Sequence, residues 1–184
     1  MKRTALFVLG LGILAISACA LAQAQDDAIA NAVQPLPANL RDGATVIKWK
    51  SDFTYDTLKK GTNGLVCYDR SGLPEQVAYS FECTSTGNLD REAQNLKAEA
   101  SGDRKATQAM LDAEEKDGTR IKPVFGSVWY HFMGADKDHA RLHMTIAVPG
   151  ATTASMGLAD NPKAGGVWIM NAGTSTAHLM TPGE

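Results

Sequence analysis

The sequence lacks every short catalytic motif of high specificity. After the first two dozen of its 184 residues it contains no G-x-S-x-G nucleophile elbow, no H-E-x-x-H metal-binding helix, no phosphate-binding P-loop and no dinucleotide fingerprint. Each absence removes the usual sequence evidence for one class: serine hydrolases, zinc proteases, nucleotide-binding proteins and dehydrogenases. We therefore expect a binding or structural role rather than a catalytic one, for a ligand that the sequence does not identify.

Clusters of one charge sign are also lacking. The chain has 18 Lys and Arg residues against 20 Asp and Glu residues, which gives a formal net charge of −2. A nucleic-acid-binding surface needs Lys and Arg gathered on one face, so nucleic acid is not expected as a partner. The only dense charge lies in residues 90–122, where the signs alternate. Such alternation is typical of a solvated helix surface.

The sequence has one long hydrophobic run, at the start of the chain. Lys2 and Arg3 precede an apolar run, and small residues of the A-x-A type follow it. This order predicts a signal peptide over residues 1–24 and hence a periplasmic or secreted protein. The run is shorter than the ~20 residues of a transmembrane helix, so none is expected in the mature chain. As an alternative, Cys19 fits the pattern of lipoprotein acylation, which would tether the protein to the outer envelope.

Cysteine is scarce, with three residues in the whole chain. Cys19 would be removed with the signal peptide or lipidated, which leaves Cys67 and Cys83 in the mature protein. An even pair in an exported domain predicts one disulfide. Neither residue belongs to a C-x-x-C unit, and this argues against zinc.

The pattern of elements predicts a single α+β domain over residues 44–184, in which an antiparallel sheet carries a helical insertion packed on it. Residues 25–43 are rich in Ala, Gln and Asp, and we expect them to form a leader or tether outside the core. Asn63-Gly64 predicts a tight hairpin between residues 57–60 and 65–68.

The helical insertion is expected over residues 88–116. Apolar residues recur there at helical spacing, namely Leu89, Ala93, Leu96 and Ala100. Ser101-Gly102-Asp103 divides the stretch in two, and Gly118 is placed to end it.

The last third of the chain predicts strands again. Residues 128–133 and 141–148 would form one hairpin, and residues 167–170 and 177–180 two closing strands. The second strand of the hairpin alternates strictly, which predicts a core face made of Leu142, Met144, Ile146 and Val148.

All four histidines and most of the methionines gather in this last third, and they form two His-x-Met pairs. Residues two apart on a strand share a face, so each pair would present an imidazole and a thioether together. That combination suits copper. The sequence thus offers a copper site made of His131, Met133, His178 and Met180. The alternative is that the methionines fill the core and the histidines make structural hydrogen bonds.

A hydrolase whose residues meet only in three dimensions is the other alternative. Its candidates are His139, His143, Asp136 and Asp138. The two aspartates also fit a solvated hairpin tip, and they lack the glycine and distal glutamate of an EF-hand loop. Ser175 and His178 are close in sequence, but a nucleophile and its base are recognised by geometry that spacing does not supply.

Residues 165–183 contain a Trp-x-Met strand, an Ala-Gly-Thr turn and a His-x-Met near the end. In these features the segment resembles the closing segment of a group of uncharacterised secreted bacterial proteins, and the likeness extends over the part of the chain from Pro123 onward. The resemblance implies export and a single domain, and it implies no reaction.

Overall fold

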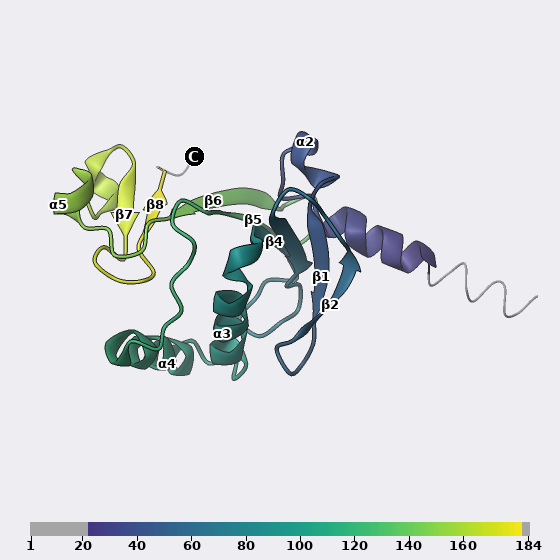
Figure 1. Cartoon of the computed structure of the whole chain (residues 1–184), viewed down its shortest axis with the longest axis horizontal. Coiled ribbons are helices and arrows are strands. Elements are labelled where there is room, and N and C mark those ends of the chain that lie inside the picture. Colours follow the sequence, from purple (N-terminus) through teal and green to yellow (C-terminus); the bar gives the residue numbers. More distant parts are fainter. Residues whose placement is uncertain (1–21, 182–184) are drawn as a thin grey trace, which may run out of the picture.

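An eight-stranded sheet separates two sets of helices (Figure 1). The structure, a computed structural model, describes residues 22–181, so the predicted signal peptide and Cys19 lie almost wholly outside it. A helix over residues 22–32, called the N-terminal helix below, and the short α2 pack on one side of the sheet. Helix α3 lies on the other side, with α4 next to it. Within the described residues, no helix is both long enough and apolar enough to cross a membrane.

The elements have the following bounds. The helices are α2 (Ala38–Arg41), α3 (Leu89–Glu99), α4 (Arg104–Asp117) and α5 (Thr153–Met156), with short 3-10 turns η1 (Thr86–Asn88) and η2 (Pro162–Ala164). The strands are β1 (Thr45–Trp49), β2 (Tyr55–Lys59), β3 (Leu65–Asp69), β4 (Tyr79–Ser85), β5 (Val128–Gly134), β6 (Arg141–Ala147), β7 (Trp168–Met170) and β8 (His178–Met180).

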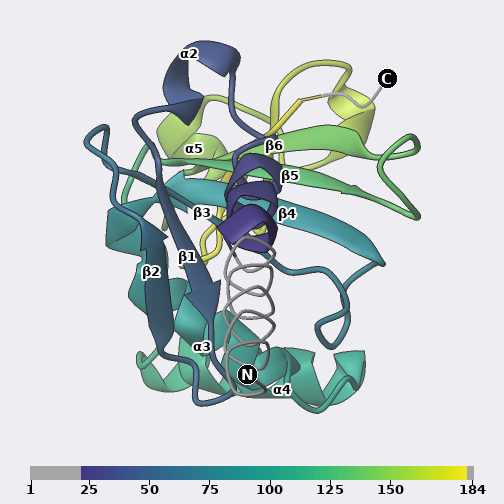
Figure 2. The same cartoon turned by 90° about the vertical axis from the view of Figure 1, so that its right-hand side faces the viewer.

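The strand order in the sheet is β2-β1-β3-β4-β5-β6-β8-β7. All neighbouring strands are antiparallel except β1 and β3, which run parallel. The chain is therefore α+β with a mostly antiparallel sheet. Figure 2 shows how strongly this sheet twists, because β1 and β2 run nearly at right angles to β5 and β6 in that view.

The strand pairing confirms the later hairpins and corrects the first one. β5 pairs with β6, and β8 pairs with both β6 and β7. The hairpin predicted at Asn63-Gly64 is wrong, because β2 and β3 do not pair with each other and β1 lies between them. β1 carries Val46 and Ile47, which point to opposite faces and are both buried. A strand that is apolar on both faces is typical of the part of a sheet that is covered on both sides, and β1 lies there, between β2 and β3.

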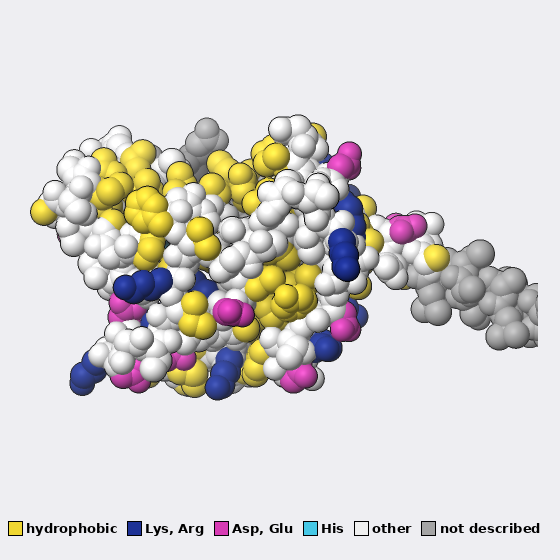
Figure 3. Space-filling view, viewed as in Figure 1, with side chains coloured by type: hydrophobic (Ala, Val, Ile, Leu, Met, Phe, Trp, Pro, Cys, Tyr) yellow, Lys and Arg dark blue, Asp and Glu magenta, His cyan; other side chains and the backbone are white. Residues whose placement is uncertain are grey.

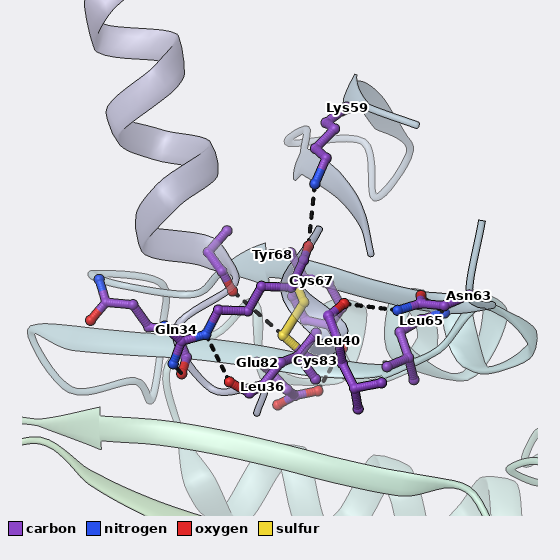
Figure 4. Close-up of a disulfide and its surroundings, with 12 residues drawn as sticks. Gln34, Leu36, Leu40, Lys59, Asn63, Leu65, Cys67, Tyr68, Glu82 and Cys83 are labelled. Atoms are coloured by element: carbon purple, nitrogen blue, oxygen red, sulfur yellow. Dashed lines mark hydrogen bonds between the residues drawn. A yellow bond between two sulfur atoms is a disulfide. The ribbon is translucent and has the colours of Figure 1, made fainter. Parts of the chain in front are cut away.

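The disulfide between Cys67 and Cys83 lies at the centre of one core (Figure 4). The two cysteines stand directly opposite each other on β3 and β4, as the sequence predicted. Ala32, Val33 and Leu36 are buried against this pair of strands. Our expectation that residues 25–43 lie outside the core is therefore wrong over its second half. Its small and apolar side chains cover a sheet face that would otherwise be open to water.

The opposite face of the sheet is apolar at one end and polar in the middle. Ile47, Val66 and Tyr68 form a small core with Leu89 of α3. Next to it, one row of directly opposed residues crosses four strands, from Tyr68 on β3 through Glu82 and His131 to His143 on β6. This row forms the floor of the site described below.

Helices α3 and α4 occupy the region predicted as helical. Asp103 caps α4 through its side chain, and Gly118 ends it in the left-handed conformation with φ 78°. The burial of α3 differs from the predicted solvated surface, since Arg91 and Glu92 are as buried as Leu96. Two charged neighbours enclosed in a helix require specific partners, because burying an unpaired charge is costly.

The predicted core face of β6 is mostly wrong. Leu142 and Met144 are each 49% exposed and Ile146 39%, whereas Val148 alone is buried. The alternation is real, but the N-terminal helix and α2 cover only the β1, β3 and β4 part of that sheet face. Hydrophobic side chains consequently reach the surface along the upper edge of the molecule, where Figure 1 places β6, β7 and α5 (Figure 3).

Candidate functional site

A cavity of about 160 Å³ lies between the polar row of the sheet and helix α3. Its walls carry most of the buried ionisable side chains of the described chain. They comprise three arginines, two glutamates and two histidines, namely Arg70, Arg91, Arg120, Glu82, Glu92, His131 and His178. Neutral polar groups complete the lining, among them Asn95, Thr145 and Thr176. A concave site with convergent ionisable groups is the usual form of a ligand pocket.

Glu82 is the fixed anion of the cavity floor. Its carboxylate accepts a hydrogen bond from the Tyr68 hydroxyl at 2.5 Å, and its Oε2 lies 2.9 Å from Nδ1 of His131. Burial alone would raise the pKa of Glu82, but the charges of His131 and Arg70 and these hydrogen bonds hold it well below its usual range. Burial and the neighbouring carboxylates in turn raise the pKa of Tyr68 well above its ordinary value, so the tyrosine stays neutral.

Arg70 faces three carboxylates with a single positive charge. Its guanidinium lies 3.1 Å from Glu82 Oε2 and 3.3 Å from Glu92 Oε1, and it also donates to Glu99. Arg70 and the charge of His131, which acts on Glu82, still leave one of the three carboxyl groups without a cation of its own. We therefore expect one carboxyl group of this cluster to stay protonated.

Glu92 is that group. Burial, together with the nearby charge of Glu82, raises its pKa to about 8 even though Arg70 opposes the shift. Near neutral pH this carboxyl is therefore mostly protonated. Asn95 donates to Oε2 at 2.9 Å, but no hydrogen-bond partner within the described residues reaches Oε1. A buried polar atom without a partner costs about 1–3 kcal/mol. The folded chain therefore leaves the hydrogen-bonding capacity of Glu92 Oε1 unused.

Arg91 supplies a buried positive charge with neutral partners. Its guanidinium donates to the Ile121 carbonyl and, at 3.2 Å, to the Thr176 hydroxyl. Among residues 22–181, no carboxylate lies within 4.0 Å of it, although the residue is only 4% exposed. Burial, and then the charge of Arg120, lowers the pKa of Arg91 to about 10, which still leaves it charged at neutral pH.

Arg120 extends the positive wall. It donates to Gln94 at 2.8 Å and to Asn95, and its carboxylate contact, with Glu114, is long at 3.7 Å. Burial lowers the pKa of Arg120 in the same way as that of Arg91. The cavity thus has a cluster of carboxyl groups around Arg70 at one end and the guanidinium groups of Arg91 and Arg120 at the other.

The two histidines of the cavity each direct Nδ1 to an oxygen atom. His178 Nδ1 lies 2.8 Å from the Thr176 carbonyl, which can only accept, so this nitrogen carries the hydrogen. Burial lowers the pKa of His178, which is therefore neutral near pH 7. His131 directs its Nδ1 to Glu82 in the same manner. In His178 the remaining nitrogen, Nε2, is then the one available to a ligand.

The structure brings together only part of the predicted copper set. His131 and His178 line the same cavity, whereas Met133 and Met180 do not. The strand register separates the two methionines, because Met133 faces Arg141 while Met180 faces Trp168. No group of three or more His, Cys, Asp and Glu within the described part of the chain is arranged to hold a metal ion.

Three of the predicted hydrolase residues, Asp136, Asp138 and His139, lie together at an exposed hairpin tip, while His143 lies on β6. Asp136 and His139 form a contact of 2.7 Å at the exposed tip of the β5–β6 hairpin, where Asp136 also accepts from the amides of Asp138 and His139. His143 is exposed and stacks near His131, with ring centroids 6.0 Å apart. Ser175 donates to Glu115 of α4. These contacts account for the hairpin turn and for the docking of α4.

The sequence analysis missed the charged residues that shape the cavity. Arg91, Glu92 and Arg120 fall in the alternating stretch that we assigned to a solvated surface. Glu82 gave a better signal, because it is an acid in the middle of a strand between Phe81 and Cys83. The chain matches no protein-family model, no curated protein and no solved structure. The case for a function therefore rests on the geometry of this site.

Proposed function

We propose that the protein is an exported binding protein whose cavity takes a small ligand with an anionic group at Arg91 and Arg120. The observation that carries the proposal is the buried guanidinium of Arg91, which donates to neutral partners and has no carboxylate oxygen within 4.0 Å among the described residues. A buried charge without a counter-charge is costly to the fold. A carboxylate or phosphate would offset that cost through charge-assisted hydrogen bonds, which guanidinium groups make in pairs.

The size of the cavity limits the ligand. A cavity of about 150 Å³ holds a benzene molecule. At about 160 Å³, the site therefore suits a compound of roughly six to ten non-hydrogen atoms. The lining favours an anion at the end formed by Arg91 and Arg120, where the one carboxylate contact within 4.0 Å in the described residues is that of Arg120 with Glu114, at 3.7 Å.

Export and the domain description belong to the same proposal. They rest on the basic and apolar start of the sequence and on its closing segment, and the disulfide agrees with an oxidising compartment. We treat residues 1–24 as the signal peptide, Cys19 as a site of acylation if the protein is anchored, and α3 with α4 as a helical insertion packed on the sheet.

Thermal unfolding of the mature protein with a panel of small acids tests the proposal. Acetate, propionate, succinate and inorganic phosphate are the probes, since a ligand at 100 times its Kd stabilises by about 2.7 kcal/mol. At least one acid should raise the melting temperature of the wild type and of Arg104→Gln, an exposed arginine at the start of α4. The shift should vanish in Arg91→Gln. An equal shift in Arg91→Gln, or none with any acid in the wild type, would contradict the proposal.

A second candidate function, copper binding, is favoured by the Nδ1 contacts of the cavity histidines. Histidines that bind metals usually donate their other ring hydrogen to a carboxylate or a backbone carbonyl. His131 directs Nδ1 to Glu82 and His178 to the Thr176 carbonyl, which is that arrangement. The participation of Met133 and Met180 stays a prediction of the sequence.

A further inference from the structure

The two ends of the cavity differ in charge, and this difference defines the ligand more closely than the anion site alone. At one end, Arg91 and Arg120 have one long carboxylate contact between them, to Glu114 at 3.7 Å. At the other end, the single guanidinium of Arg70 faces the carboxyl groups of Glu82, Glu92 and Glu99. The first end thus lacks a close anion, and the second end holds Glu92 Oε1, a buried oxygen without a hydrogen-bond partner in the described residues.

Glu92 shows where a cation would sit. The side chain is fully buried, it lines the cavity, and its Oε1 has no hydrogen-bond partner in residues 22–181. Arg70 Nη1 is 3.3 Å away, which brings charge but no hydrogen bond to this oxygen. A ligand ammonium group has three hydrogens to donate and would satisfy Oε1 directly.

We infer that the ligand is a small amino acid in its zwitterionic form, with its carboxylate at Arg91 and Arg120 and its ammonium group at Glu92. The inference rests on the proposed anion site and adds the second charge. Arg91 and Glu92 are consecutive in α3, so one turn of helix presents both ends of the binding site. The cavity volume of about 160 Å³ admits a short amino acid.

Binding is then coupled to a proton. The raised pKa of Glu92, about 8, means that its carboxyl is mostly protonated at pH 7 in the free protein. An ammonium group in contact with it favours the ionised form, because an opposite charge lowers the pKa of a carboxyl group. The proton leaves to solvent, so each binding event at pH 7 should release about one proton.

Matched pairs of ligands test the inference by calorimetry on the mature protein. The pairs are β-alanine with propionate and 4-aminobutyrate with butyrate, which differ only in the amino group. At least one amino acid should bind at least tenfold tighter than its partner acid at pH 7. Titrations in two buffers of different ionisation enthalpy should show release of about one proton for that amino acid and less for the acid.

Two variants locate the second charge. Glu92→Gln should remove the preference for the amino acid and the proton release, while the acids bind as before. Asp90→Asn, an exposed acid on the same helix, should change neither.

Acids that bind the wild type as tightly as the amino acids, or more tightly, would overturn this inference but would still support the anion site. If no compound of either kind binds, the proposed function fails and this inference fails with it. The wild-type comparison stays decisive even if Glu92→Gln does not fold.

Discussion

Glu82 on β4 and His131 on β5 stand directly opposite each other, with the carboxylate Oε2 2.9 Å from the ring Nδ1. The same carboxylate accepts from Tyr68 on β3, so one buried anion ties three neighbouring strands together. Ten residues along the chain, Glu92 closes the cavity from α3 with its pKa shifted the other way. The two glutamates thus have opposite effects on how stability depends on pH.

Replacement of Glu82 by Gln should destabilise the protein by about 3 kcal/mol at pH 7, because it leaves the other members of a buried ionic network without their anion. The pKa of Glu82 is lower in the folded chain than its ordinary 4.5. Its charge therefore contributes stability above about pH 4.5, and this contribution is lost as the pH falls toward the folded pKa.

Urea unfolding of the wild type and of Glu82→Gln measures this contribution. The difference between their free energies of unfolding should become smaller in acid. Asp56→Asn, exposed on β2, serves as the control and should stay within about 0.5 kcal/mol. A Glu82→Gln variant as stable as the wild type at pH 7 would disprove the network's role.

Replacement of Glu92 by Gln should have the opposite pH signature. The folded chain holds a proton on Glu92 up to about pH 8, whereas an ordinary glutamate loses it near 4.5. The folded state therefore binds more protons in this window, and the contribution of Glu92 to stability falls as the pH rises from about 4.5 to 8. Relative to the wild type, Glu92→Gln should gain stability across that window. Urea unfolding at pH 5, 6.5 and 8 measures the difference, and a constant difference would show that Glu92 titrates normally.

Helix α3 should depend on Leu96 for its docking. This side chain is 7% exposed, whereas Ala93 in the preceding turn is only half-buried. Leu96→Ala should cost about 2 kcal/mol or more, as expected for a buried leucine. Ala93→Ser should cost less than about 1 kcal/mol. Chemical denaturation compares the two, and small, equal losses would mean that α3 does not anchor the cavity wall through Leu96.

Copper binding should require both cavity histidines if the second candidate function is right. Titration of the mature protein with copper in its reduced state should saturate at one equivalent, and joint replacement of His131 and His178 by Gln should abolish it. Binding should weaken as the pH falls below the histidine range, since a protonated imidazole cannot ligate. His139→Gln at the hairpin tip is the control.

Replacement of Met133 and Met180 by Leu tests whether copper uses all four predicted residues or only the two histidines that line the cavity. Weaker binding in this variant would support the four-residue set, and unchanged binding would assign the metal to the histidines without the thioethers. Copper that binds equally without either histidine lies elsewhere.

The sequence predicted the elements better than their pairing. The helices on either side of Ser101-Gly102-Asp103 and the disulfide followed from local signals: helical spacing, a break and a pair of cysteines in extended segments. Asn63-Gly64 was an equally strong local signal, and Gly64 does adopt a positive φ of 74°. The strand that pairs there, β1, comes from earlier in the chain. Turn chemistry alone carries no information about such a neighbour.

The site could not be predicted for the same reason, because it is formed by residues that are distant in the sequence. Arg91 and Glu92 belong to a run of alternating charge that is indistinguishable from a solvated helix face until the sheet is in place. Their burial depends on Glu82, His131 and Thr176, which come from three distant strands and loops. His131 and His178 were found as candidates because they are rare residues with a regular spacing. The arginines that line the cavity have no regular spacing that would single them out.

A crystal structure of the mature protein, grown with the acid or amino acid that stabilises it most, tests the central claim most directly. The account predicts density for one carboxylate in the cavity, with its oxygens within hydrogen-bond distance of the Arg91 guanidinium and close to Arg120. A ligand bound anywhere else, or a cavity that contains only water at a saturating concentration of the compound, would contradict it.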